Sequence, residues 1–466
     1  MPSNELSKVV QELVKYGYNA EPEVVQFINN TPDPNSTIKF LISNIPEEIF
    51  TLNMSHISNI YGRSPSTSPS ISILNDMTGN STGSGTYNDF VSIFQDRLSQ
   101  LTSILSNRIK PYPLNSLKNT SGEVRVVGMV SNIQKTNSNH ILIELEDISG
   151  TFSMLVHNNS EIFNLTDEIL LDEVIGVKGK LSSDSEILFA EVIYFPDIPP
   201  NFRPPHATRP VQAALLSDIH VGSKHFNSEL WSDFTSWLKT PEAEPIEYIL
   251  IAGDLVEGVG VYPGQDIDLE IINIYEQYDA FNECLKDISG DISMIMIPGN
   301  HDAVRLAEPQ PGFDLEIKNI LSSSNFHFTS NPSTVIVEGV PILMYHGVSL
   351  DEIIAETHST QVSYDAPHNA MIQLLKKRHL APQFGSRTRI SPEQKDYLVI
   401  DKIPSVFHSG HVHKFGYGKY HNVLVINSGC WQSQTDFQKR ANIIPDVGYA
   451  PILDLDTLNL TIRKFS

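Results

Sequence analysis

The chain has 466 residues, 40% of them hydrophobic, and a formal net charge of −23 at pH 7. This size predicts two or three domains, and the acidity argues against broad binding to a polyanion by this chain alone, because phosphate contacts need clustered Lys and Arg. With two cysteines, no signal peptide at the start and no apolar run of the roughly 20 residues that span a bilayer, we expect a cytoplasmic protein without disulfides or membrane association.

The first 60 residues have apolar side chains at helical spacing. The clearest stripe consists of Leu6, Val9, Val10, Leu13 and Val14. We predict a small helical module over residues 1–60, with further helical segments at 23–28 and 37–42. We expect the apolar stripe to form the core of this module; the alternative is a face that docks a partner.

The composition then changes abruptly to Ser, Thr, Pro, Gly and Asn. Such a segment cannot bury enough apolar surface to offset its chain entropy, so we predict a flexible linker over residues 61–86. A helix is expected to follow at 87–110, with one apolar face and with Arg97 and Arg108 in solvent. That face comprises Phe90, Phe94, Leu98, Leu101 and Leu105.

Period-two alternation replaces helical spacing over residues 122–195, where about five short strands are separated by Gly and Asn turns. We predict a small β-barrel over residues 111–200, for which the OB-fold is the best candidate. Such barrels often bind single strands through aromatic platforms and basic grooves. These strands are poor in both, so we favour a structural or subunit-contact barrel, with DNA binding as the alternative.

From Val211 onward, short apolar runs alternate with longer polar or helical stretches. This pattern is typical of an α/β sandwich whose functional groups lie at strand ends. The predicted fold class is therefore a multidomain α/β (α+β) chain with an N-terminal helical module, an OB-fold barrel and a two-sheet α/β sandwich over residues 207–466.

Five short polar motifs in this last region each follow an apolar run. They read Asp218-Ile-His220, Gly253-Asp254, Gly299-Asn300-His301-Asp302, Tyr345-His346-Gly347 and Gly410-His411-Val412-His413. Together they supply three carboxylates, an amide and five imidazoles. Mixed Asp, His and Asn ligands suit Mn, Fe or Zn rather than a thiolate-type zinc site. We therefore expect a site for two metals, with one His to spare.

The spacing within the motifs predicts how the ligands meet. Asp218 and His220 would share one side of an extended segment, because alternate residues share a face. Gly253 would allow a tight turn before Asp254, whose carboxylate could bridge two cations. The two imidazoles of the last motif could reach different metals from one loop.

Two cations roughly 3.5–4 Å apart can hold both oxygens of an in-line displacement at phosphorus. His301 directly follows the expected ligand Asn300, so we expect its imidazole to protonate the leaving oxygen or to stabilise the charge at phosphorus. Asp302 is expected to orient that imidazole.

The five motifs resemble those of the calcineurin-like metallophosphoesterase family, which run D-x-H, G-D, G-N-H-D/E, H and G-H-x-H. The resemblance implies one metal held by Asp218, His220, Asp254 and His413. It implies a second metal held by Asp254, Asn300, His346 and His411, with His301 as the catalytic residue. Many members carry G-D-x-x-D, whereas this chain has Glu257 at the last position. This difference puts in doubt only the role of this residue in supporting the ligands, and not the ligands themselves.

Longer segments around the motifs look like the small subunits of archaeal family-D DNA polymerases, over about residues 87–466. They are the segments at 258–264, 299–311, 374–382, 396–401 and 429–438. This resemblance implies a 3′→5′ exonuclease that removes mismatched nucleotides from single-stranded DNA ends and prefers Mn²⁺, with Fe or Zn as alternatives. It also implies a heterodimer with the large catalytic subunit, a nucleoid-associated location, and DNA and a sliding clamp as further partners.

Several basic residues are candidates for steering phosphate, with surface solvation or ion pairing as the equal alternative. They are Arg305, Arg378, His379, Arg387 and Arg389. Thr435, Phe437 and Gln438 are expected to pack the sandwich or a subunit interface. Two other functions stay open: a non-catalytic scaffold, as in related non-catalytic subunits of eukaryotic replicative polymerases that have lost ligands, and a free-standing phosphoesterase acting on small substrates.

Overall fold

The computed structural model describes residues 5–466 except 30, 32–33, 45–50, 55, 57–69, 358–360 and 441. The chain divides into two compact units, Met1–Pro69 and Ser70–Ser466. Among the described helices, none is both long enough and apolar enough to cross a membrane.

The first unit is the predicted helical module. It contains α1 (Glu5–Lys15), α2 (Pro22–Asn29) and α3 (Pro34–Asn44), with β1 (Asn19–Ala20) paired in parallel with β2 (Thr51–Leu52). Val9 and Leu13 are buried in the core of this unit, whereas Val10 and Val14 on the same helix are exposed. The apolar stripe of α1 therefore forms the core of the module only in part.

The prediction of a flexible linker over 61–86 is wrong for residues 70–86; residues 61–69 lie outside the described part of the chain. β3 (Ile71–Asn75) pairs antiparallel with β13 (Ser333–Val337) and extends a sheet of the second unit. The main-chain nitrogen of Gly83 then donates a hydrogen bond to the buried carboxylate of Glu393. Backbone pairing and a buried carboxylate thus order a segment whose composition alone predicts disorder.

The helix α5 (Tyr87–Ser106) begins at Thr86, which forms a capping box with Asp89. The expectation that Arg97 is solvated is wrong: its side chain is 1% exposed, and its Nε donates to Asp396 at 2.8 Å. The reason is that α5 packs against the barrel and also contacts the sandwich, so the helix has two buried sides. Arg108, just beyond the helix, is exposed as expected.

The predicted barrel is confirmed as a closed five-stranded barrel with the strand order β4-β5-β6-β8-β7. Its strands are β4 (Glu123–Lys135), β5 (Ile141–Asp147), β6 (Gly150–Val156), β7 (Val174–Leu181) and β8 (Ile187–Tyr194). The short helices η1 (Leu114–Asn119) and η2 (Phe163–Glu168) pack on its apolar interior. Lys377 of the sandwich pairs with Glu173 of the barrel at 2.7 Å in a fully buried contact.

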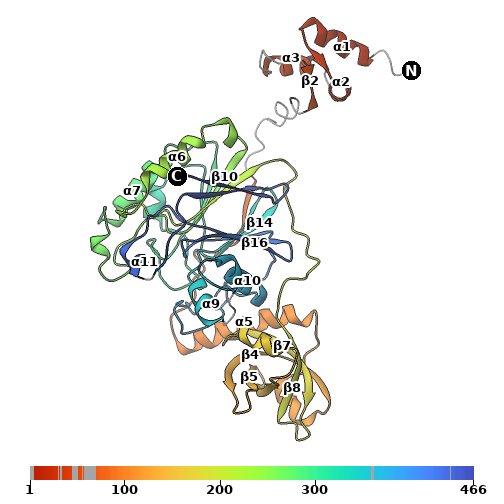
Figure 1. The fold of residues 1–466 in the computed structure, drawn as a ribbon, viewed down its shortest axis with the longest axis vertical. Coiled ribbons are helices and arrows are strands. Elements are labelled where there is room, and N and C mark those ends of the chain that lie inside the picture. Colours follow the sequence, from red (N-terminus) through yellow and green to blue (C-terminus); the bar gives the residue numbers. More distant parts are fainter. Residues whose placement is uncertain are drawn as a thin grey trace. The chain divides into compact units, whose positions relative to one another are not determined.

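The rest of the second unit contains two six-stranded sheets (Figure 1). In the first, β9 (Gln212–Leu216), β10 (Ile246–Ala252), β11 (Ser293–Ile297) and β12 (Phe326–Phe328) are parallel, and β18 (Tyr449–Asp454) and β19 (Leu460–Lys464) are antiparallel. The second contains β3, β13, β14 (Val340–Met344), β15 (Val406–Ser409), β17 (Val423–Ser428) and β16 (Phe415–Tyr420).

The two sheets pack face to face through a shared apolar core that contains Leu215 and Leu250 of the first sheet and Ile342 and Val406 of the second. The outer face of the first sheet is covered by α6 (Ser228–Trp237), α7 (Ile274–Leu285) and α8 (Leu315–Ile320). The outer face of the second is covered by α9 (Leu350–Glu356) and α10 (Pro367–Lys377). This four-layer arrangement confirms the predicted two-sheet sandwich.

Candidate metal centre

The predicted ligands follow the carboxyl ends of strands in both sheets. In chain order, β9 leads to Asp218 and His220, β10 to Asp254, β11 to Asn300, β14 to His346, and β15 to His411 and His413. Because β9, β10 and β11 are parallel, their carboxyl ends lie at the same edge of the first sheet. β14 and β15 are likewise parallel neighbours in the second sheet. The topology therefore brings all seven predicted ligands to one place.

The backbone at five of the seven ligand positions is left-handed rather than extended. Positive φ angles occur at Asp218 (53°), His220 (57°), Asp254 (53°), His411 (71°) and His413 (55°). The expectation that alternation along an extended segment brings the first two ligands together is therefore wrong. Left-handed backbone is uncommon for residues other than Gly, and clusters of it are typical of functional sites.

Two glycines of the motifs make room for this geometry. Gly253 has a φ of +90°, which confirms the tight turn expected before Asp254. At Gly299 an added Cβ would lie 2.2 Å from Oδ1 of Asp254 and 2.8 Å from the His346 ring. Any side chain at that position would therefore displace two predicted ligands.

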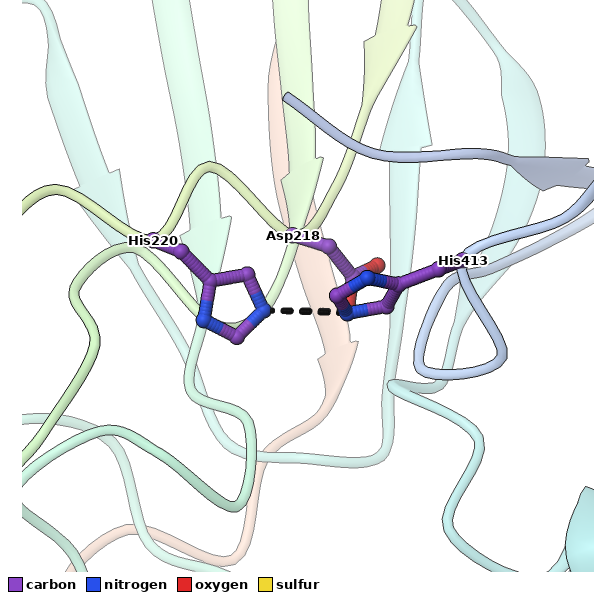
Figure 2. A group of neighbouring side chains, drawn as sticks. All are labelled: Asp218, His220 and His413. Carbon is purple, nitrogen blue, oxygen red and sulfur yellow. Dashed lines mark hydrogen bonds and ion pairs between the residues drawn. The ribbon is translucent and has the colours of Figure 1, made fainter. Parts of the chain in front are cut away.

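One group of ligands converges from two loops (Figure 2). The Nε2 atoms of His220 and His413 face each other at 3.1 Å. Oδ1 of Asp218 lies 3.4 Å from Nε2 of His413 and 3.9 Å from Nε2 of His220. These three buried side chains aim their donor atoms at one point, as the ligands of a single cation would.

A second group lies beside the first and shares Asp254 with it. Oδ2 of Asp254 is 3.6 Å from Nε2 of His220 and 3.2 Å from Nε2 of His346. Oδ1 of Asn300 is 3.0 Å from Nε2 of His346 and 2.9 Å from Nδ1 of His411. The position of Asp254 between the two groups is what a bridging carboxylate requires.

Each ligand imidazole is held through its other ring nitrogen. Nδ1 of His220 lies 3.0 Å from Glu257, and Nδ1 of His346 lies 2.8 Å from the carbonyl oxygen of Ala252. Nε2 of His411 lies 3.4 Å from Asp351, and Nδ1 of His413 lies 2.9 Å from the Gln438 amide. Such contacts fix ring orientation and are typical of imidazoles that bind metals.

Sequence patterns do not mark most of these supporting residues. Nothing in the sequence singles out Asp351, which is about sixty residues from the imidazole that it contacts. Gln438 is expected from sequence only to pack, whereas the structure places it against His413. Glu257 departs from the family pattern, and its spacing from Asp254 is the available signal for a role at the site.

His301 lies beside the first group, with its ring centroid 4.7 Å from that of His220. Its Nδ1 is 2.7 Å from the main-chain oxygen of Glu257, a group that can only accept, so Nδ1 carries the proton and Nε2 is left for a substrate. The expectation that Asp302 orients this imidazole is wrong. The Asp302 carboxylate instead accepts hydrogen bonds from the Tyr278 hydroxyl and from the main chain of Gly299.

The electrostatics of the cluster favour added positive charge. Among the residues that the structure describes, no Lys or Arg forms an ion pair with Asp218 or Asp254. Burial by itself would lower the pKa of His346, but the carboxylates of Asp254 and Asp218 outweigh it and raise that pKa to about 10. Burial, together with the neighbouring Asp254, raises the pKa of Asp302 to about 7. Two buried carboxylates surrounded by imidazoles are a donor set that suits divalent cations.

The basic candidates for phosphate steering lie in other surroundings. Arg378 is buried and donates to the main-chain oxygens of Ile400 and Asp401, and His379 is buried with its Nε2 2.9 Å from Asp396. Arg305 donates to Glu393 at 2.8 Å and to Ser81 at 2.9 Å. None of these three joins the ligand cluster, and the two buried ones are not available to a DNA backbone. Arg387 and Arg389 are exposed and stay candidates.

Comparison with known proteins finds two family models that match parts of the predicted barrel and sandwich. The B-subunit family of DNA polymerases alpha and epsilon matches residues 213–416, and the OB-fold nucleic acid binding domain family matches residues 124–191. The chain is 48% identical to the DNA polymerase II small subunit of Halobacterium salinarum, over 100% of both chains. It is 42% identical to that of Archaeoglobus fulgidus, over 81% of this chain and 77% of the relative. It is 40% identical to that of Methanocaldococcus jannaschii, over 82% and 66%.

Proposed function

Because the chain belongs to the family of archaeal DNA polymerase II (family-D) small subunits, we propose that it carries a 3′→5′ exonuclease acting on single-stranded or mismatched DNA ends. The observation that carries this proposal is the ligand cluster. All seven expected donors converge, and every ligand imidazole is held through its second nitrogen. A scaffold subunit would need no such arrangement.

The proposed metal ligands are those that the two groups contain. Asp218, His220 and His413 would hold one cation, Asn300, His346 and His411 the other, and Asp254 both. When bound, two divalent cations, with Mn²⁺ as the first choice, polarise the phosphodiester and lower the pKa of water. The assignment of each ligand to one cation stays a prediction.

The chain itself would contribute the proton that the leaving group needs. Water attacks phosphorus at the last linkage, the bond from phosphorus to O3′ breaks, and a 5′-mononucleotide leaves. His301 is proposed to act in its doubly protonated form: the proton on Nε2 passes to O3′, while the proton on Nδ1 stays in the hydrogen bond to the Glu257 carbonyl. General acid catalysis of this kind contributes roughly 10²–10⁴-fold.

The proposed partners follow from the same family. We propose a heterodimer with the large catalytic subunit, which would present DNA to the cluster and offset the net charge of −23. The OB-fold barrel is a second surface at which this subunit could meet DNA. Contact with a sliding clamp stays a prediction.

The test is degradation of a 5′-labelled single-stranded oligonucleotide with Mn²⁺, with and without the large subunit. We expect a ladder that shortens from the 3′ end, and a loss of at least about 10²-fold in rate for His301→Ala with metal content nearly unchanged. His225→Ala, which removes a nearby imidazole outside the cluster, is the matched control and should keep the wild-type rate.

Two results would contradict the proposal. An oligonucleotide that stays intact under all conditions would favour a scaffold, or a small-substrate phosphoesterase if a model phosphoester is cleaved. A His301→Ala variant with the wild-type rate would remove His301 from the mechanism.

A further inference from the structure

Glu257 contacts two imidazoles of the centre through two different groups. Its Oε2 atom lies 3.0 Å from Nδ1 of His220, and its main-chain oxygen lies 2.7 Å from Nδ1 of His301. Both groups accept a hydrogen bond, so both imidazoles carry their proton on Nδ1. Nε2 of His220 is therefore left for a metal, and Nε2 of His301, when that ring is doubly protonated, can give its proton to a leaving oxygen.

The side chain of Glu257 is itself fixed from several directions. It is 1% exposed. Gln432 donates to Oε2 at 2.7 Å, and Tyr262 donates to Oε1 at 3.3 Å. Gln265, in η4 (Gln265–Ile267), donates to Oε1 at 3.3 Å and to the main-chain oxygen at 2.9 Å. The two carboxylate oxygens thus receive four donors.

We propose that Glu257 is a positioning residue that orients both the imidazole of the proposed metal ligand His220 and the imidazole of the proposed acid His301. The role toward His301 rests on the proposed exonuclease function, whereas the role toward His220 does not. Because one residue holds both rings, whose centroids are 4.7 Å apart, any shift of its backbone moves the ligand and the acid at once.

The chemistry of the contacts requires a carboxylate of this length. An amide has only one acceptor oxygen, so the side chain in Glu257→Gln would point its NH₂ group at two hydrogen-bond donors. In Glu257→Asp the charge stays, but the side chain is one methylene shorter and the carboxylate withdraws from His220. Both variants leave the main-chain oxygen that holds His301 in place.

The experiment is a Mn²⁺ titration of the full chain by calorimetry, with thermal unfolding as a check of folding. We expect Glu257→Gln and Glu257→Asp to lower the affinity for one of two Mn²⁺ ions by about 10–100-fold, the usual cost of losing such a partner. Asp266→Asn removes an exposed carboxylate from the same loop and should bind Mn²⁺ as the wild type does.

The carbonyl contact is tested with a second variant, Gln265→Met, which also removes the 3.3 Å hydrogen bond to Oε1 of Glu257. Gln265→Met removes the second donor to the Glu257 carbonyl and should slow cleavage at saturating Mn²⁺ by about tenfold or more, with a shifted pH profile and a smaller change in Mn²⁺ affinity than Glu257→Gln. Wild-type Mn²⁺ affinity in both folded Glu257 variants would overturn the role toward His220. A wild-type rate and pH profile in Gln265→Met would overturn the role toward His301. A wild-type chain that binds two Mn²⁺ ions but cleaves no DNA would refute the proposed function and leave the Mn²⁺ result intact.

Discussion

Two buried clusters of carboxylates and imidazoles in this chain differ in whether an arginine side chain neutralises the carboxylate. In one, Asp396 receives hydrogen bonds from Arg97 at 2.8 Å and from His379 at 2.9 Å. In the other, Asp218 and Asp254 are surrounded by imidazoles, with no Lys or Arg in an ion pair to either among the described residues. The first cluster carries its own positive charge, whereas the second leaves room for cations from solution. A buried Asp–His cluster is therefore a metal-site candidate only where the chain supplies no permanent cation.

The strongest test of this contrast is to remove the shared carboxylate. Asp254→Ala should lose both Mn²⁺ ions, because its Oδ2 lies between the two ligand groups, and exonuclease activity should disappear with them. Metal analysis after gel filtration measures the content. The control is Asp266→Asn, which changes an exposed carboxylate outside the ligand groups and should keep two equivalents. Retention of two equivalents by Asp254→Ala would show that Asp254 does not bridge.

The opposite result is expected where the chain supplies the cation. Arg97→Met would leave Asp396 buried without its guanidinium partner and should lower the free energy of unfolding by about 3–5 kcal/mol. Metal content in the folded fraction should not change. Urea unfolding measures the effect, and Arg108→Met, at an exposed position on the same segment, should cost about 1 kcal/mol or less. If Arg97→Met left the free energy of unfolding unchanged, the contrast between the two clusters would not hold.

Metal removal sharpens the comparison further. Binding to the folded state alone stabilises it by about 2.7 kcal/mol at a free concentration of 100 times Kd. EDTA should therefore lower the unfolding temperature of the wild type but not that of Asp254→Ala. Arg97→Met should keep the full response to Mn²⁺, since its defect lies in the other cluster. An equal response in wild type and Asp254→Ala would indicate that Mn²⁺ binds elsewhere.

The smallest expected effect is a pH dependence at Glu393. Burial by itself would raise the pKa of Glu393, but hydrogen bonds from Thr82, Ser81 and Gly83 and from Arg305 outweigh it and lower the pKa to about 2. A carboxyl group whose pKa is lower in the folded than in the unfolded chain, where it is about 4.3, stabilises the fold above that value. This stabilisation is lost as the pH falls from about 4.3 to about 2.

Glu393→Gln should therefore be less stable than the wild type at pH 7, and the difference should shrink below about pH 4. Urea unfolding across this range measures it. Glu186→Gln, at an exposed position on the barrel, is the control. A difference that does not depend on pH would show that the Glu393 contacts act through shape rather than charge.

Local patterns predict the parts of this fold that depend on local chemistry. The five strands of the barrel and the ligand motifs are predictable from alternation and from polar residues at strand ends. The β3 strand is not, because Ile71–Asn75 is short, lies beside Ser- and Pro-rich sequence and pairs with a strand about 260 residues away.

The electrostatic partners of single residues also cannot be predicted from the sequence. Arg378, His379 and Arg97 look like solvent-exposed bases, and only tertiary packing buries them. The ligand positions are predictable but their backbone is not, because a left-handed φ at a non-glycine residue follows from contacts that the chain makes elsewhere.

The β3 strand has a consequence for how the chain can be shortened. It lies at the end of the second sheet, so β13 is paired on both sides only while residues 71–75 are present. A chain that begins after residue 86 would expose the row of unpaired backbone groups on β13, and such an edge invites pairing with another molecule. We therefore expect a chain trimmed to residue 87 to self-associate, whereas a chain that begins at residue 70 keeps this strand pairing.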